Sequence, residues 1–170
     1  MQINQTQIMS KWVNPEEWQR LRISEFCPVC QNGKPLGIVA ELEASYLTSV
    51  EDAPMKGYCC LVLKRHAIEI HDLTTEEAAA LMRDMQTTSK AVAEITQPIK
   101  MNYEIHGNSI PHLHVHFFPR YVGDPFENAP VNPRIISKPV YMAGEFAEFV
   151  KQLQKAITSI TTSMKTHKDA

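Results

Sequence analysis

The chain has 170 residues, a formal net charge of −2 and 21% charged residues, which suits one compact domain with a hydrophobic core. The balanced charge leaves no basic stripe and argues against a duplex nucleic acid or an anionic membrane as the main partner. No apolar run approaches the roughly 18 residues of a membrane span, and residues 1–10 are polar without a signal-peptide core, so we expect a cytoplasmic protein.

The beginning of the chain predicts an arm and then a helix. Residues 1–13 have no clear periodicity, and we expect them to form an N-terminal arm outside the domain. A helix is predicted from Asn14 to about Ser24, because Asn14 is a favourable N-cap and Pro15 suits the first turn. Two acidic residues follow the proline, where they stabilise the positive end of the helix dipole.

The four cysteines form two local pairs, Cys27 with Cys30 and Cys59 with Cys60, unlike the scattered set of a secreted disulfide scaffold. In a thioredoxin-like redox protein a Cys-x-x-Cys motif follows a strand and opens a helix, whereas here a helix precedes the motif. We therefore favour a structural metal site at the first pair and keep a redox dithiol as the alternative. The second pair lies in an apolar run, where buried small residues are expected.

The middle of the chain predicts strands and one long helix. Residues 37–50 indicate two short strands with a bend between them, and residues 58–63 form an almost continuous apolar run, which is typical of a central strand. Thr74 and Glu77 form a capping box that begins an amphipathic helix ending near residue 95.

Two further strands are predicted at residues 101–105 and 112–118, separated by a turn signal, and they should pair as a hairpin. The second stretch, His-Leu-His-Val-His-Phe-Phe, has histidine at every second position. A strand would therefore line His112, His114 and His116 along one face and leave an apolar set for the core on the other.

The end of the chain combines a loop and a helix. Residues 122–140 are rich in proline and too long for a simple connection, which is typical of a lid or an interface arm. Residues 143–165 have helical apolar spacing and should pack on the domain, which we place at residues 14–142, or on a dimer partner. The expected fold is α+β, an antiparallel sheet of about five strands with two long helices and one short helix.

Three imidazoles on one strand face allow three interpretations. Alternate residues of a strand lie too far apart for all three to bind one ion at about 2 Å. A solvated row of histidines is possible. In a catalytic row, one neutral imidazole is the nucleophile and a neighbour, protonated near neutral pH, donates to an anionic substrate oxygen. The preceding Gly107-Asn108-Ser109 favours catalysis, because backbone N–H groups and a hydroxyl can hold a phosphate.

Arg120 follows the histidine stretch by two residues. We expect it to be either a phosphate contact or a solvated charge.

These residues also carry a family resemblance. Residues 112–118 match the histidine triad pattern, three alternating histidines separated by apolar residues and followed by two more, at every position. Residues 107–112 resemble the Gly-Gln-Ser-Val-x-His that precedes the pattern, with Asn108 in place of glutamine. Residues 57–66 resemble the Gly-His-x-Leu-Val-x-Pro-Lys-x-His strand. Over residues 25–121 the chain therefore resembles the histidine triad (HIT) family.

The resemblance implies a nucleotide hydrolase or nucleotidyl transferase that cleaves at the α-phosphate of a nucleoside phosphoramidate, a dinucleoside polyphosphate or a similar substrate. It implies that His114 is the nucleophile, forming a nucleotidyl-phosphohistidine intermediate, and that His116 donates to a non-bridging phosphate oxygen. Asn108 and Ser109 would hold the phosphate, and Asp52 is the candidate for binding the ribose hydroxyls.

The same resemblance implies a structural Zn²⁺ ion and a homodimer. Family members with this cysteine pair complete the metal site with the histidine of the Lys-x-His strand and the first histidine of the triad. The implied ligands are Cys27, Cys30, His66 and His112. Galactose-1-phosphate uridylyltransferases contain a similar block but carry glutamine where this chain has His116, which favours the hydrolase. A nucleotide-binding module without activity and a zinc-stabilised interaction domain remain the alternatives.

Overall fold

A single antiparallel sheet forms the centre of the protein. The structure is a computed structural model that describes residues 14–132 and 139–166; the expected arm at 1–13 and part of the proline-rich segment lie outside the described residues. The sheet has five strands in the order β1-β2-β3-β5-β4, with the bounds β1 (Ile38–Glu41), β2 (Ser45–Thr48), β3 (Cys59–Leu63), β4 (Lys100–Glu104) and β5 (His114–Arg120). The predicted α+β fold with about five antiparallel strands is confirmed.

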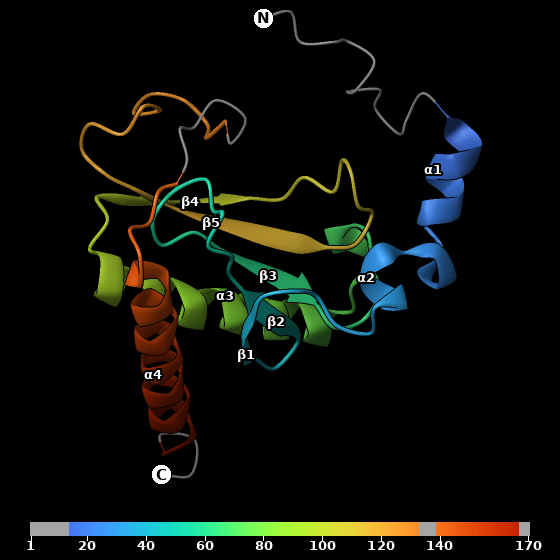
Figure 1. Ribbon diagram of the computed structural model, residues 1–170. Coiled ribbons are helices and arrows are strands. Elements are labelled where there is room, and N and C mark those ends of the chain that lie inside the picture. Colours follow the sequence, from blue (N-terminus) through green and yellow to red (C-terminus); the bar gives the residue numbers. More distant parts are fainter. Residues whose placement is uncertain (1–13, 133–138, 167–170) are drawn as a thin grey trace, which may run out of the picture.

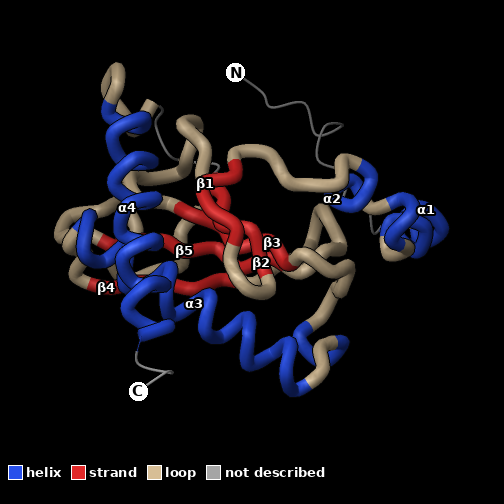
Figure 2. Tube along the Cα trace, turned by 90° about the horizontal axis from the view of Figure 1, so that it is seen from below, coloured by secondary structure: helices blue, strands red, loops and turns tan. Residues whose placement is uncertain are grey.

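Two long helices cover one face of this sheet. Figure 1 shows α3 (Thr75–Thr96) and α4 (Glu145–Thr166) on the same side, and the view from below in Figure 2 places both in front of the strands. Two short helices, α1 (Pro15–Leu21) and α2 (Pro28–Gln31), lie at one end of the sheet, and the 3-10 turns are η3 (Ser24–Phe26) and η4 (Ile70–Asp72). None of the described helices is both long and apolar enough to cross a membrane.

The capping box predicted for the long central helix is confirmed. The Thr74 hydroxyl accepts from the backbone N–H of Glu77 at 3.2 Å, and the Glu77 carboxylate accepts from the N–H of Thr74 at 2.9 Å. The helix ends at Gln97, which has a left-handed φ of 47° and precedes Pro98. Both ends of α3 are therefore fixed by local sequence.

The first helix is shorter than predicted, because it ends at Leu21 and not near Ser24. The carbonyl of Arg22 accepts a hydrogen bond from Nε2 of His66 at 2.8 Å, and Ile23 is extended. The chain thereby leaves the helix and turns towards Cys27. A tertiary contact ends the helix here, and local spacing did not reveal it.

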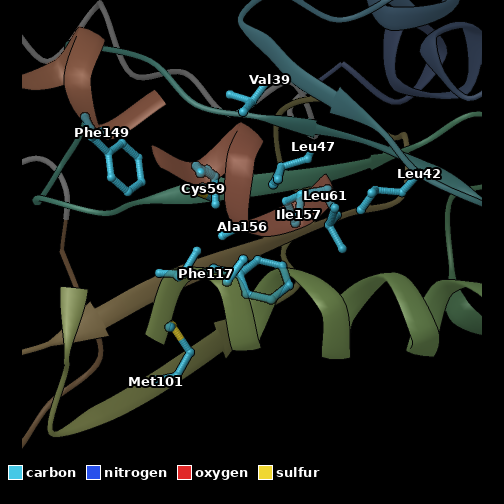
Figure 3. Close-up of a cluster of buried hydrophobic side chains, with 14 of the residues drawn as sticks. Val39, Leu42, Leu47, Cys59, Leu61, Met101, Phe117, Phe149, Ala156 and Ile157 are labelled. Atoms are coloured by element: carbon cyan, nitrogen blue, oxygen red, sulfur yellow. The ribbon is translucent and has the colours of Figure 1, made fainter. Parts of the chain in front are cut away.

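The main core lies between the sheet and the two long helices (Figure 3). Val115 and Phe117 point from β5 into this core and are fully buried, as the alternating pattern predicted. Helix α4 adds apolar side chains to the same cluster, namely Phe149, Leu153, Ala156 and Ile157. The opposite face of β5 carries His114, His116 and Phe118, so the strand separates the core from the histidine face.

The predicted hairpin exists, but the histidine strand begins two residues later than expected. Strands β4 and β5 pair antiparallel from Lys100 with Arg120 to Glu104 with His116, and the intervening residues 105–113 form a long loop. Within this loop the N–H of Leu113 donates to the carbonyl of Ala67 at 2.7 Å. His112 consequently precedes the strand and is not part of a continuous row of three imidazoles.

Arg120 is neither a phosphate contact nor a solvated charge. Its guanidinium forms a buried ion pair with Asp124, with 2.8 Å between Nη2 and Oδ1, and it also donates to the carbonyls of Phe126 and Ala129. The hydrogen bonds and charge of Arg120, together with backbone N–H donors, lower the pKa of Asp124 to about 2, although burial acts in the opposite direction. The arginine therefore shapes the first half of the proline-rich segment, which packs Phe126 on Phe118.

The bend between β1 and β2 is attached to α3 through a buried carboxylate. Asp84 accepts hydrogen bonds from the backbone N–H of Glu43 at 3.0 Å, from that of Ala44 at 2.8 Å and from the hydroxyl of Ser45 at 2.7 Å. Asp84 is only 4% exposed. Removing this acceptor would leave three donors without their partner.

We therefore expect Asp84→Ala to lower the free energy of unfolding by about 3 kcal/mol. Urea denaturation followed by circular dichroism measures the change. Gln86→Ala, at an exposed position of the same helix, is the control and should change stability by less than about 0.5 kcal/mol. Equal stabilities of the two variants would contradict the structural role of the carboxylate.

Candidate active site and metal centre

The two histidines of β5 face solvent from the middle of the sheet. In the pairing with β3, His114 lies opposite Val62 and His116 lies opposite Cys60. Their ring centroids are 4.8 Å apart and the ring planes are nearly perpendicular, at 89°. Both side chains are half-buried, so they are held by the sheet and remain open to a ligand.

The backbone fixes the tautomer of His114. Its Nδ1 lies 2.6 Å from the carbonyl oxygen of His112, and a carbonyl can only accept, so Nδ1 carries the proton. In the neutral ring the lone pair is then on Nε2. An imidazole held in this way has the form that a nitrogen nucleophile needs.

His116 is neutral in the free protein, which differs from the expectation of a protonated neighbour. Burial lowers the pKa of His116 to about 4, and the nearby His114 and His106 add to this effect. Its Nδ1 is 2.8 Å from the hydroxyl of Tyr58. The ring can still donate one N–H, and the charge of a bound phosphate would favour its protonated form.

A largely apolar cavity of about 330 Å³ opens beside His114. Its lining includes Val29 and Leu36 from residues 27–36, the segment that we call the N-terminal knuckle. It also includes Val50, Tyr58, Val62 and Ile110, which come later in the chain. Asn108 and Ser109 are exposed in the loop that leads to Ile110. Asp52 is exposed in the loop after β2 and is not among the lining residues, although Val50 is.

The four residues implied as zinc ligands come together at one end of the sheet. One potential ligand atom from each of Cys27, Cys30, His66 and His112 lies within 4.8 Å of the others. Nδ1 of His112 is 3.5 Å from Sγ of Cys27 and 3.6 Å from Sγ of Cys30, and Nδ1 of His66 is 3.4 Å from Sγ of Cys30. The residues are far apart in sequence, so the fold assembles the cluster.

These separations fit one tetrahedral metal ion. Zinc bonds of about 2.3 Å to sulfur and 2.0–2.1 Å to nitrogen give a sulfur–nitrogen separation of about 3.5 Å at the tetrahedral angle. The other ring nitrogens donate to backbone carbonyls, Nε2 of His112 to Leu63 at 2.7 Å and Nε2 of His66 to Arg22 at 2.8 Å. Each ring therefore directs the lone pair of Nδ1 towards the thiols, as the ligands of a metal require.

The cluster is poorly suited to the redox alternative. A reactive thiol has a lowered pKa, whereas burial and the neighbouring Cys27 raise the pKa of Cys30 to about 11. The raised pKa keeps the Cys30 thiol protonated unless a cation compensates for the negative charge of the thiolate. Cys59 and Cys60 are buried in β3, as predicted, and lie outside the cluster.

Tyr58 and His106 contact His116 but were not singled out from the sequence. The ring centroid of His106 is 5.7 Å from that of His116, and its Nε2 is 2.8 Å from the carboxylate of Glu104. A signal for Tyr58 was present, since it stands where the family strand pattern has histidine. For His106, the missing information was the register that pairs Glu104 with His116.

The lowered pKa of His116 predicts a contribution to the pH dependence of stability. In the unfolded chain His116 has the ordinary histidine pKa of about 6.5 and binds a proton below that pH. In the folded chain His116 stays neutral until the pH approaches its folded pKa of about 4. This contribution is complete above pH ~6.5 and is lost as the pH falls towards about 4, by on the order of 2–3 kcal/mol.

We therefore expect His116→Gln to flatten the decline in unfolding free energy between about pH 6.5 and 4.5, measured by urea denaturation at several pH values. His71→Gln, at a histidine whose side chain is 83% exposed, is the control and should keep the wild-type profile. Parallel profiles for wild type and His116→Gln would contradict the burial argument.

Comparison with known proteins agrees with this geometry. The family model of the HIT domain matches residues 26–123. An adenosine 5'-monophosphoramidase of Schizosaccharomyces pombe is 28% identical over 97 residues, which cover 56% of this chain and 72% of that protein. A histidine triad protein of Bradyrhizobium japonicum is 33% identical, with a TM-score of 0.63 and coverage of 71% of this chain and 89% of that one.

A solved structure with lower identity supports the fold. The zinc-bound histidine triad family protein of Mycobacterium smegmatis is 19% identical, with a TM-score of 0.61 and coverage of 83% of this chain and 99% of that one. The matched residues contain β1 to β5, α3 and the whole histidine stretch. On the domain match, the sheet and the histidine face, the chain belongs to the histidine triad family.

Proposed function

We propose that the protein hydrolyses a nucleoside 5'-phosphoramidate, or a related nucleotide such as a dinucleoside polyphosphate, at the α-phosphate. The observation that carries the proposal is the contact between Nδ1 of His114 and the carbonyl of His112, which leaves the lone pair of Nε2 for attack. The activity named for the Schizosaccharomyces pombe relative supports a phosphoramidate as the substrate class.

In the proposed reaction, Nε2 of His114 forms a bond to the α-phosphorus while the bond to the leaving group breaks. The departing amine takes up a proton from the solvent, and the nucleotide is now attached to His114. Water then attacks the same phosphorus and gives a proton back to the solvent, the bond to Nε2 breaks, and the nucleoside monophosphate leaves. His116 donates to a non-bridging oxygen, and Asn108 and Ser109 hold the phosphate from the loop before the strand.

The cavity beside His114 suits the nucleoside part of such a substrate. Its apolar lining can enclose a base, while His114 at its edge marks the position of the phosphate. Asp52 is proposed to bind the ribose hydroxyls, on the ground that Val50, two residues before it, lines the cavity.

We further propose that Cys27, Cys30, His66 and His112 bind a structural Zn²⁺ ion. Two sulfurs and two imidazoles are a common tetrahedral zinc set, and the separations of 3.4–3.6 Å suit it. The zinc-bound relative from Mycobacterium smegmatis supports this choice of metal. The ion would tie the N-terminal knuckle to the loop before the catalytic strand and take no part in the reaction.

A homodimer stays a prediction. Strand β4 is the edge of the sheet, and it and the loop after it expose Tyr103 and Ile105, which are 46% and 41% exposed. An exposed apolar edge strand is a natural surface for pairing with a second chain.

Metal analysis of the purified protein tests the zinc site. We expect about one Zn²⁺ per chain, and Cys27→Ser should lose most of the metal and unfold at a lower temperature, because metal binding contributes to folding. Cys60→Ala, which removes a thiol outside the cluster, should retain the metal. Less than about half an equivalent in the wild type would count against the four-ligand site.

Incubation with an adenosine 5'-phosphoramidate and a diadenosine polyphosphate tests the hydrolase. We expect AMP from at least one of them, and water labelled with ¹⁸O should place the label in AMP. His114→Ala should lower kcat by at least about 1,000-fold with little change in stability, because the nucleophile is removed.

Two outcomes separate the alternatives. Transfer of the adenylyl group from the substrate to a second phosphorylated acceptor, with the adenylylated acceptor in place of free AMP as the product, would identify a nucleotidyl transferase. If neither substrate is turned over and His114→Ala behaves like the wild type, the proposed enzyme activity is excluded, and a binding or interaction module is the remaining function.

A further inference from the structure

We propose that Tyr58 is a positioning residue that holds His116 in the tautomer with its proton on Nε2, so that this N–H donates to the substrate phosphate. The use of that proton rests on the proposed hydrolase function. The tautomer itself can be measured in the free protein, so the two ideas can fail separately.

Tyr58 is the residue that makes the closest polar contact to the ring of His116. Its hydroxyl oxygen is 2.8 Å from Nδ1 of His116. The two rings are also stacked, with centroids 5.9 Å apart at 25°, and Phe118 packs on Tyr58 with centroids 5.2 Å apart. The contact therefore combines a hydrogen bond with ring packing that restricts both side chains.

The protonation states allow the hydroxyl of Tyr58 to donate this hydrogen bond. Burial, with Cys60 and Cys59 adding, raises the pKa of Tyr58, so its hydroxyl keeps its proton. Burial lowers the pKa of His116 to about 4, so its ring is neutral and has one N–H and one lone pair. If the hydroxyl donates to the lone pair of Nδ1, the proton of His116 must be on Nε2.

The two neighbouring imidazoles then have opposite tautomers. The carbonyl of His112 accepts from Nδ1 of His114, which leaves a lone pair on Nε2. In the proposed arrangement the hydroxyl of Tyr58, 2.8 Å away, donates to Nδ1 of His116, which leaves a proton on Nε2. One strand face thus presents a nucleophile and a hydrogen-bond donor side by side. Neither histidine has to be charged, so His116 can donate to the phosphate although its pKa is low.

The backbone around Tyr58 fixes the place of its ring. The carbonyl of Tyr58 accepts from the hydroxyl of Ser49 at 2.7 Å, and the N–H of Gly57 donates to the hydroxyl of Tyr141 at 2.8 Å. Gly57 has a φ of +78°, and a Cβ there would lie 2.7 Å from Thr96. The hydroxyl of Tyr58 is therefore positioned before a substrate binds.

Imidazole ¹⁵N NMR of the full chain, without substrate, tests the tautomer. Protonated and unprotonated ring nitrogens have well-separated shifts, and His116→Gln identifies the signals. We expect His116 to be protonated on Nε2 in the wild type and to become a mixture of tautomers in Tyr58→Phe, which keeps the ring but lacks the hydroxyl. The proposal is overturned if the wild-type ring is protonated on Nδ1, which would make Tyr58 the acceptor, or if Tyr58→Phe leaves the tautomer unchanged.

Kinetics with the adenosine phosphoramidate test the use of the proton. Tyr58→Phe should lower kcat about ten-fold with less than about a two-fold change in KM, since one hydrogen bond to the donor is lost. Tyr103→Phe is the matched control, because its hydroxyl is 2.6 Å from Ser89 on the helix-covered side, and its kcat should match the wild type. An unchanged kcat in Tyr58→Phe overturns the catalytic part. A wild type inactive on every nucleotide contradicts the proposed function but leaves the NMR result valid.

Discussion

His112 is the residue on which the organisation of this protein depends, because two sites use different atoms of it. Its ring lies among Cys27, Cys30 and His66, with Nδ1 directed at the two thiols. Its backbone carbonyl accepts from Nδ1 of His114. The side chain is fully buried, so neither group can move alone. The position of His114, the proposed nucleophile, is therefore tied to the packing of the Cys27, Cys30, His66 and His112 cluster.

The histidine face obtains chemical asymmetry from hydrogen bonding and not from charge. His114 and His116 are the same residue type on the same strand face, yet one ring has a carbonyl beside Nδ1 and the other has a phenol hydroxyl. The carbonyl can only accept, whereas the hydroxyl can donate, and in the proposed arrangement this difference gives the two identical rings different tautomers. Burial, which lowers the pKa of His116, makes this solution more suitable than a permanent imidazolium.

Local patterns in the sequence predicted much of the fold, and tertiary contacts explain the differences. The capping box of α3 and the alternation of Val115 and Phe117 depend on neighbouring residues, so they could be predicted. The late start of β5 depends on the contact of Leu113 with Ala67, and the burial of Arg120 depends on Asp124. Contacts of this kind require the folded chain.

The candidate site was predicted in a similarly uneven way. The candidate metal site assembles from the residues that the family resemblance implied, although the cysteine pair and the two histidines are distant in sequence. Tyr58 was visible only as a departure from the family strand pattern.

The position of α4 has a different consequence. The family match ends at residue 123, but Leu153 and Ile157 of α4 complete the main core, and Gln154 donates to the carbonyl of Val39 in β1. The segment that the family model matches is thus smaller than the segment that forms the main core, and a chain cut after residue 123 would expose its apolar sheet face and self-associate.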